Sequence, residues 1–204
     1  MELASSADKI GKIRHIDAAC SANRSNDRYA NVWRLQKPLA GGGALMDMGI
    51  YALQSTRYLS GEEPISVKTT RFDPPDGGES GPFQTVDRNI IFDLEFPSGM
   101  TATVTSSYAV GANRTQLSAE NGDLDLNPMM NYNGNRAYYT PKGGKREEVT
   151  YTWAQHFACE MDAFAQCVLQ DKESPTPGEE GLRDMKIITA AYESAATGKP
   201  VKLA

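Results

Sequence analysis

The sequence predicts an α+β domain: an open, mostly antiparallel β-sheet with helices packed on one face. Segments that alternate apolar and polar residues, as half-buried strands do, cluster in the middle of the chain. Helical patterns stand apart from them, one before this cluster and two after it, which is the order typical of α+β domains. The 204 residues are 40% hydrophobic and 23% charged, enough for one sizeable core, so we expect a single domain over residues 1–204.

The N-terminal part of the chain contains the first strand and the first long helix. Residues 1–7 indicate a helix stub, residues 12–20 alternate as a strand, and the polar residues 21–29 predict a loop. Residues 44–59 repeat apolar side chains at steps of three and four. Gly61 follows where a helix C-terminal glycine belongs, so this segment is predicted to be a helix.

The middle of the chain changes to a period of two. Turn signals such as Asn121-Gly122 divide it into seven predicted strands, and a Pro- and Gly-rich stretch at 73–81 is expected to be an exposed loop. The predicted strands cover residues 65–72, 85–96, 100–110, 114–120, 123–126, 136–140 and 147–152.

Two helices and a short strand at 201–203 are predicted at the end of the chain. The first helix covers residues 153–170. The second begins at Thr176-Pro177-Gly178-Glu179, with threonine as the cap and proline in the first turn, and ends at Gly198. If the helices cover one face of the sheet, its other face must meet water or a partner.

Composition excludes several classes of function. A net charge of −5 argues against nucleic-acid binding, and the chain has neither a run of 18 apolar residues nor a signal peptide, so no membrane role is expected. The three cysteines form no CxxC pair, which favours a reducing, cytoplasmic location, and Cys159 and Cys167 are expected to be buried in the first of the two last helices. His15 and His156 have no ligand-like spacing, so no metal site is predicted.

The glycine turn at 41–43 is the first candidate functional segment. Glycines before a helix let the backbone approach a ligand and can direct free N–H groups toward it. The segment lacks the G-x-G-x-x-G spacing of a dinucleotide fingerprint, so that interpretation is rejected. A flexible turn before a helix is the structural alternative.

Asp47 and Tyr51 form the second candidate. They are four residues apart in the predicted helix and are therefore expected to project from one face. A carboxylate in the first turn also suits the helix dipole, and a half-buried tyrosine needs no catalytic role, so a structural reading stays open for both residues. Arg34 beside Trp33 could bind a sugar or form a structural ion pair. His156 could donate to a substrate hydroxyl or simply cap its helix.

Together, these segments closely resemble the Gfo/Idh/MocA family of glucose–fructose oxidoreductase and inositol dehydrogenase. The resemblance rests on Trp33-Arg34-Leu35, on the glycine turn with its helix (39–51) and on Arg57-Tyr58-Leu59-Ser60-Gly61-Glu62-Glu63-Pro64. The tail, with Tyr192-Glu193-Ser194-Ala195 and Gly198-Lys199-Pro200-Val201, is similar too. The resemblance spans essentially the whole chain.

The resemblance implies the C-terminal, substrate-binding domain of an NAD(P)-dependent oxidoreductase of sugars or polyols. It implies that Asp47 orients the substrate and that Tyr51 stands where many relatives have histidine. A tyrosine at this place is more similar to the glucose–fructose oxidoreductase branch than to the inositol dehydrogenase branch. Arg34 and His156 become candidate substrate ligands, and Gly42 and Gly43 lie on the cofactor side. It also implies a homodimer or tetramer that assembles through the sheet.

The family's N-terminal Rossmann domain, with its glycine fingerprint and its lysine, does not precede residue 1. We therefore expect a fragment that is inactive alone, with NAD or NADP held mainly by the other domain. A free tyrosine has a pKa of about 10, so Tyr51 would need a nearby cation, such as that lysine, to act as a base. The alternative is a non-catalytic oligomerisation or carbohydrate-binding module.

Overall fold

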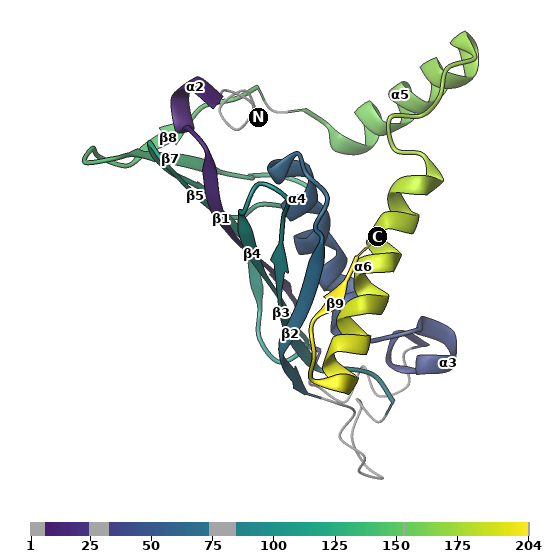
Figure 1. Cartoon of the computed structure of the whole chain (residues 1–204). Coiled ribbons are helices and arrows are strands. Elements are labelled where there is room, and N and C mark those ends of the chain that lie inside the picture. The colour runs from purple at the N-terminus through teal and green to yellow at the C-terminus, as the bar shows by residue number, and fades with distance from the viewer. Residues whose placement is uncertain (1–6, 25–32, 74–84, 153, 204) are drawn as a thin grey trace.

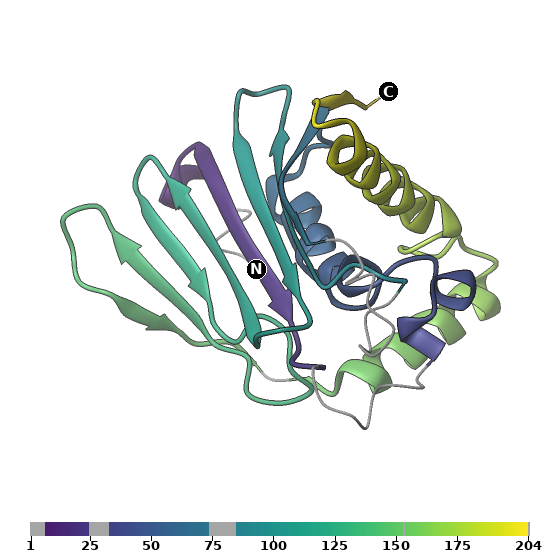
Figure 2. The same cartoon turned by 90° about the horizontal axis from the view of Figure 1, so that it is seen from below.

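A computed structural model describes residues 7–24, 33–73, 85–152 and 154–203. It contains one nine-stranded sheet, and the helices α4 (Ile50–Ser60) and α6 (Gly178–Thr197) lie on the same face of it (Figures 1 and 2). Neighbouring strands are antiparallel except for one central pair. The predicted α+β class with an open, mostly antiparallel sheet is therefore confirmed.

The strands are ordered β8-β7-β6-β5-β1-β4-β3-β2-β9 across the sheet. In chain order they are β1 (Ile13–Ser21), β2 (Ser66–Asp73), β3 (Asn89–Glu95), β4 (Thr101–Ser107), β5 (Ala112–Ala119), β6 (Gly122–Leu126), β7 (Ala137–Pro141), β8 (Glu147–Val149) and β9 (Val201–Lys202).

Strand β1 holds the centre of the sheet. It runs parallel to β4, with Ile16 opposite Ala102, and antiparallel to β5, with Ile16 opposite Leu117. Ile16, Ala18 and Cys20 are buried on its core-facing side, as expected of a strand whose alternate side chains face the core, and Ala19 and Ser21 are buried as well. The sequence-predicted strand at 12–20 therefore becomes the central strand of the sheet.

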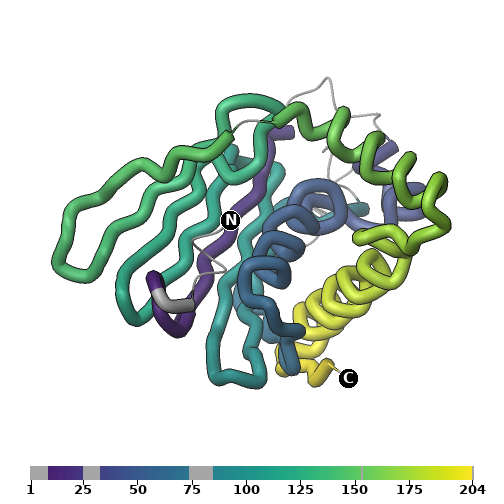
Figure 3. The backbone as a smooth tube through the Cα atoms, turned by 90° about the horizontal axis from the view of Figure 1, so that it is seen from above, coloured from purple at the N-terminus to yellow at the C-terminus, as the bar shows by residue number. Residues whose placement is uncertain are grey.

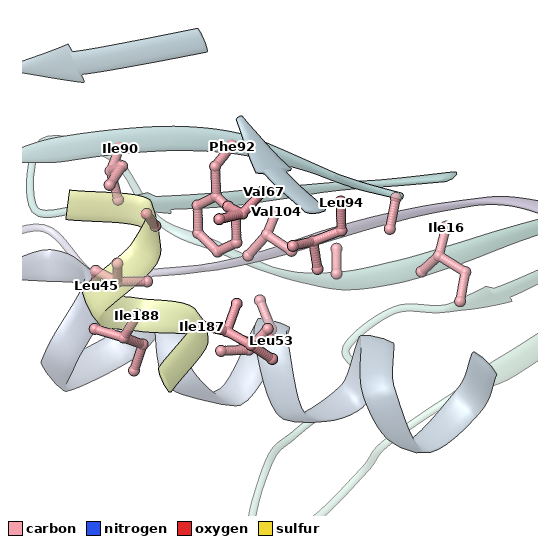
Figure 4. Packing of buried hydrophobic residues seen from close by; sticks show 14 of the residues in the cluster. Ile16, Leu45, Leu53, Val67, Ile90, Phe92, Leu94, Val104, Ile187 and Ile188 are labelled. Atoms are coloured by element: carbon pink, nitrogen blue, oxygen red, sulfur yellow. The ribbon is translucent and has the colours of Figure 1, made fainter. Parts of the chain in front are cut away.

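The core lies between the sheet and its two helices. Phe92 of β3 and Val104 of β4 pack toward Leu53 of α4 and toward Ile187 and Ile188 of α6 (Figure 4). All five side chains are at most 3% exposed. At about 25 cal/mol per Å² of buried apolar surface, this layer is the main source of the domain's stability.

A buried arginine joins the end of α4 to the start of α6. The Arg57 side chain is only 4% exposed and donates to Glu63 through two nitrogens, at 2.6 and 2.8 Å, and to Asp184 at 2.7 Å. Glu180 lies 3.2 Å from the same guanidinium. These hydrogen bonds raise the pKa of Arg57, with the Glu63 bond the largest cause, so the guanidinium stays charged.

The helix predicted at 44–59 is confirmed, but its first turn is not a regular α-helix. Residues Leu45–Gly49 form a π-helical segment, η3, and the regular helix α4 continues from Ile50. Two short helices that the sequence did not indicate precede it: η2 (Trp33–Leu35) and α3 (Lys37–Ala40). The predicted stub at 1–7 and the loop at 73–81 each have only one described residue, and the loop predicted at 21–29 is described up to Arg24, with Ser21 still part of β1. A short helix, α2 (Ala7–Ile10), precedes β1.

Helix α5 (His156–Gln170) corrects one expectation. None of its residues is buried, and it projects away from the sheet (Figures 1 and 3). Cys159 is exposed and Cys167 only partly covered, so the prediction that both are buried was wrong. The helix carries the predicted apolar pattern, but none of the described residues buries it.

The start of α6 corrects a second detail. The helix begins at Gly178 with Pro177 in the N-cap position, and no side chain caps it. Thr176 is therefore not the cap that the sequence suggested. The C-terminal end is as predicted, with Gly198 in the left-handed conformation at φ 66°.

Candidate functional site

The site is built around Asp47, which lies in the π-helical segment η3 before α4. Its side chain is 20% exposed and lies within reach of three donors. Arg34 Nε is 3.3 Å from Oδ1, Arg24 Nη2 is 3.6 Å from Oδ2, and the hydroxyl of Tyr108 donates to Oδ2 at 3.1 Å. The structure thus brings Arg34 and Asp47 into contact, and their role at a substrate stays a prediction.

Tyr108 follows strand β4 and is completely buried. Burial first, and the negative charge of Asp47 second, raise the pKa of this phenol far above its ordinary value. Tyr108 therefore stays protonated and acts as a hydrogen-bond donor. Sequence reasoning missed it because it lay inside a predicted strand, 61 residues from its acceptor.

Tyr51 is placed differently from Asp47. Its side chain is 46% exposed, at the rim of a groove of about 360 Å³ between α4 and the strands β6 and β7. Other lining residues are Gln54, Ser55, Tyr58, Leu124, Leu126 and Met129. No described contact joins Tyr51 to Asp47: the wider π turn changes the angle between positions four apart, which a regular helix would stack.

His156 is the first residue of α5 and is exposed. Its neighbour Phe157 contacts the ring of Tyr132, with centroids 5.4 Å apart. No described contact brings His156 to Asp47 or Tyr51. Its proposed role at the substrate therefore stays a prediction.

The glycine turn is packed against protein. The N–H of Gly43 donates to Asp87 Oδ1 at 2.6 Å, and the N–H of Leu45 donates to Asp87 Oδ2 at 3.1 Å. A Cβ atom at Gly43 would lie 2.1 Å from the carbonyl oxygen of Asp87, and one at Gly42 would lie 2.3 Å from the hydroxyl of Tyr192. Close packing alone is therefore enough to require both glycines.

These contacts also bear on a bound cofactor. The Gly43 and Leu45 amides, which could have met a phosphate, are already occupied by a carboxylate, so this turn does not fit the phosphates of a dinucleotide. The expectation that the turn presents free N–H groups is wrong for Gly43. A place for Gly42 and Gly43 on the cofactor side stays a prediction.

Other kinds of site can be checked on the described residues. They contain no group of three or more His, Cys, Asp or Glu side chains that could hold a metal ion. Within the same residues, no helix has the length and apolar character needed to cross a membrane.

Residues 6–203 match the family model described as the C-terminal alpha/beta domain of an oxidoreductase family, Gfo/Idh/MocA. The chain belongs to this family. The structure agrees: aldose–aldose oxidoreductase from Caulobacter crescentus has a TM-score of 0.89 and 32% identity over 99% of this chain and 58% of that one. A levoglucosan dehydrogenase shares the fold, with a TM-score of 0.82 at 20% identity over 99% of this chain and 62% of its own.

Two curated relatives are sugar dehydrogenases. D-xylose 1-dehydrogenase [NADP(+)] of Haloarcula marismortui is 31% identical over 84% of this chain and 47% of its own length. D-xylose 1-dehydrogenase (NADP(+)) 2 of Haloferax volcanii is 32% identical over 83% of this chain and 50% of its own. The chain thus spans about half the length of these curated relatives.

Proposed function

We propose that this chain is the substrate-side half of an NAD(P)-dependent oxidoreductase that acts on a sugar or polyol. The observation that carries the proposal is the Asp47 carboxylate, which is partly exposed at a helix start and fixed by Arg24, Arg34 and Tyr108. Relatives named as NADP-dependent xylose dehydrogenases and as an aldose oxidoreductase support this substrate class and cofactor.

Asp47 would orient the substrate. Two guanidinium groups and one phenol contact this carboxylate, which offers about four acceptor positions, so acceptor capacity remains for a sugar hydroxyl. A fixed carboxylate that accepts a hydrogen bond from one hydroxyl selects one orientation of the sugar ring. Such positioning contributes to the rate without any proton transfer to Asp47. Arg34, whose side chain is 47% exposed, would contact the same substrate.

Tyr51 would take the proton of the reacting hydroxyl. Its exposed phenol lies one turn beyond Asp47 and is free to meet a substrate that lies over the start of α4. The nicotinamide, held by the other half of the enzyme, would accept the hydride. A lysine of that half, held close to the phenol, would stabilise the phenolate by charge proximity.

Helix α5 would dock on the nucleotide-binding half. Phe157, Met161, Phe164 and Val168 are each more than half exposed, in an amphipathic helix with no buried residue. A 15-residue helix is marginal by itself, so a partner surface is needed to hold it. The solved aldose–aldose oxidoreductase aligns with 99% of this chain over only 58% of its own length, and the remainder of its sequence supports such an occupant.

The uncovered face of the sheet would join copies of the protein into a dimer or tetramer. No described helix lies over it (Figure 2). It carries positive and negative side chains, which form the ion pairs of Arg114 with Asp17 at 3.3 Å and of Arg146 with Asp125 at 2.5 Å. A face with both charges can meet its own copy across a two-fold axis. Sedimentation of the full-length protein tests this, and a strict monomer would contradict it.

The decisive experiment uses the full-length enzyme with a panel of aldoses and polyols and both nicotinamide cofactors. We expect oxidation of at least one sugar, and Tyr51→Phe should lower kcat by about 100-fold or more, the usual contribution of a general base. Tyr58→Phe, an exposed tyrosine two turns along α4, is the matched control. Unchanged kcat in Tyr51→Phe across pH would remove Tyr51 from the proton path. Binding of sugars without turnover by the full-length protein would favour the non-catalytic alternative.

A further inference from the structure

The carboxylate of Asp87 closes the start of the helix that carries Asp47. Asp87 is 3% exposed and lies just before strand β3, more than 40 residues from the glycine turn in sequence. Its two oxygens accept the N–H groups of Gly43 and Leu45, and its backbone carbonyl accepts the N–H of Ala44 at 3.1 Å. Three consecutive amides are therefore held by one residue.

This arrangement caps the start of a helix. The first N–H groups of a helix have no partner within it and are normally satisfied by a side chain close in sequence. Neither η3 nor α4 has a local side-chain cap. Asp87 supplies that cap from a distant segment, and its negative charge lies at the positive end of the helix dipole.

Tyr192 of helix α6 fixes the orientation of this carboxylate. Its hydroxyl donates to Asp87 Oδ1 at 2.7 Å, the same oxygen that accepts the Gly43 N–H. Burial, and then the charge of Asp87, raise the pKa of Tyr192 far above its ordinary value, so it remains a donor. The glycine at 42 leaves room for this hydroxyl, since a Cβ there would collide with it.

The contact network leads directly to Asp47. The N–H of Asp47 donates to the carbonyl of Gly43 at 3.1 Å, so the residue held by Asp87 is also the first backbone partner of Asp47. On the other side, Ser106 donates to the carbonyl of Ala44 at 2.7 Å. The turn before Asp47 is thus held by Asp87, just before β3, and by Ser106 of β4. These contacts fix the backbone from which the Asp47 side chain extends.

We infer that Asp87 and Tyr192 are positioning residues: they lock the start of the helix so that the Asp47 carboxylate stands in the orientation that the substrate requires. The inference rests on the proposed function, because it assumes that Asp47 orients the substrate. Neither residue need touch the sugar. A displacement of about 1 Å in a positioning group can cost about 100-fold in rate, so a small loosening of this turn is enough to be measured.

Tyr192→Phe tests the inference with the least disturbance, because it keeps the ring and removes only the hydroxyl. In the full-length enzyme we expect kcat to fall about tenfold, with KM changed less than twofold, as for a group whose loss misplaces Asp47 in the transition state. Amide hydrogen exchange should rise at Gly43 and Leu45. Tyr139→Phe is the control, since its hydroxyl also donates to backbone carbonyls but lies on β7.

A double-mutant cycle with Asp47→Asn separates positioning from general stability. If Tyr192 acts through Asp47, adding Tyr192→Phe to Asp47→Asn lowers kcat less than twofold further. Equal losses of kcat in both backgrounds, or a Tyr192→Phe enzyme with normal kcat and unchanged exchange at Gly43, would overturn the inference.

The two hypotheses fail in different ways. If Asp47→Asn leaves kcat unchanged, the proposed role of Asp47 fails, and so does the positioning role of Asp87 and Tyr192. If Asp47→Asn lowers kcat but Tyr192→Phe does not, only the positioning role of Asp87 and Tyr192 fails. Asp87→Asn keeps the shape of the side chain but removes its charge, and should raise exchange at Leu45 more than Tyr192→Phe does, because it replaces the oxygen that accepts this amide.

Discussion

The hydroxyl of Tyr108, just after strand β4, donates to the carboxylate of Asp47, in the segment η3 before helix α4, across 3.1 Å. Tyr108 is completely buried, whereas Asp47 is partly open to solvent. The sheet thus holds one side of the carboxylate and leaves another side for a ligand.

Replacing Tyr108 by phenylalanine should weaken both the site and the fold. The change removes a buried hydrogen bond to a charged group, which should lower the free energy of unfolding by about 1–3 kcal/mol. In the full-length enzyme, kcat/KM should fall by about tenfold because Asp47 loses a fixed donor. Thermal unfolding and steady-state kinetics measure the two effects. Tyr132→Phe, at a position 75% exposed, is the control, and equal results for the two variants would refute the role of Tyr108.

Two glycine-to-alanine changes should have opposite signs. Gly43→Ala places a Cβ 2.1 Å from the Asp87 carbonyl, which is backbone and cannot move cheaply, so the protein should be destabilised by about 3 kcal/mol or more. Gly181→Ala, in the interior of α6 with open space around it, should stabilise by up to about 1 kcal/mol through helix propensity. Denaturant unfolding of the two variants measures both changes in the free energy of unfolding. A tolerated Gly43→Ala would contradict the packing described here.

Acid should weaken the ion cluster around Arg57. The hydrogen bond from Arg57 is the largest effect on Glu63, and it lowers the pKa of this carboxyl below its ordinary value. The contribution of Glu63 to stability is therefore present above its unfolded pKa of about 4.3 and is lost as the pH falls through the lower folded value.

Asp184 opposes this trend, since burial raises its pKa and its protonation on acidification favours the fold. Glu63→Gln should consequently lower stability at neutral pH and flatten its fall below about pH 4, whereas Glu160→Gln, exposed on α5, should change neither. Urea unfolding at a series of pH values measures this. Parallel curves for Glu63→Gln and the unmodified protein would refute it.

A charged residue on the apolar face of α5 should lower the stability of the full-length protein but not that of the 204-residue chain. Phe164→Asp should leave unfolding of the 204-residue chain nearly unchanged, because the side chain is 63% exposed there. In the full-length protein it should lower the melting temperature by several degrees, since about 1 kcal/mol corresponds to a few degrees. Gln166→Asp, on the opposite face of the same helix, is the control. Identical effects of Phe164→Asp and Gln166→Asp would argue against docking through this face.

Local patterns were enough to predict most of the fold. Alternation located β1 and the strands from β2 to β8, and three- and four-residue periodicity located α4, α5 and α6, because burial on one face leaves a mark in each segment separately. The sequence-predicted strand at 85–96 begins only at Asn89. Its first residues include Asp87, which bonds to the glycine turn, so a demand from elsewhere in the fold overrode local preference.

The site was predicted only in part, for the same physical reason. Asp47, Tyr51 and Arg34 were named as candidates because they lie in one short segment with a recognisable resemblance. The structure brings Arg34 to Asp47, and the roles of all three residues stay predictions. Asp87 and Tyr108 were missed because their hydrogen bonds span 44 and 61 residues, and no periodicity marks such a pair. The sequence also could not predict which surface packs on the apolar face of α5, because an amphipathic pattern indicates that one face is buried but not what buries it.

The position of β1 in the sheet has a consequence for the order of folding. This strand is made first, yet its partners begin about 80 residues later, with His15 opposite Thr101 and Ile16 opposite Leu117. During synthesis it must therefore wait, unpaired, until β4 and β5 have emerged. Closing such long loops is slow relative to forming hairpins. The β3–β4 and β5–β6 hairpins should form early, and insertion of the first strand between them should be the late, rate-limiting event.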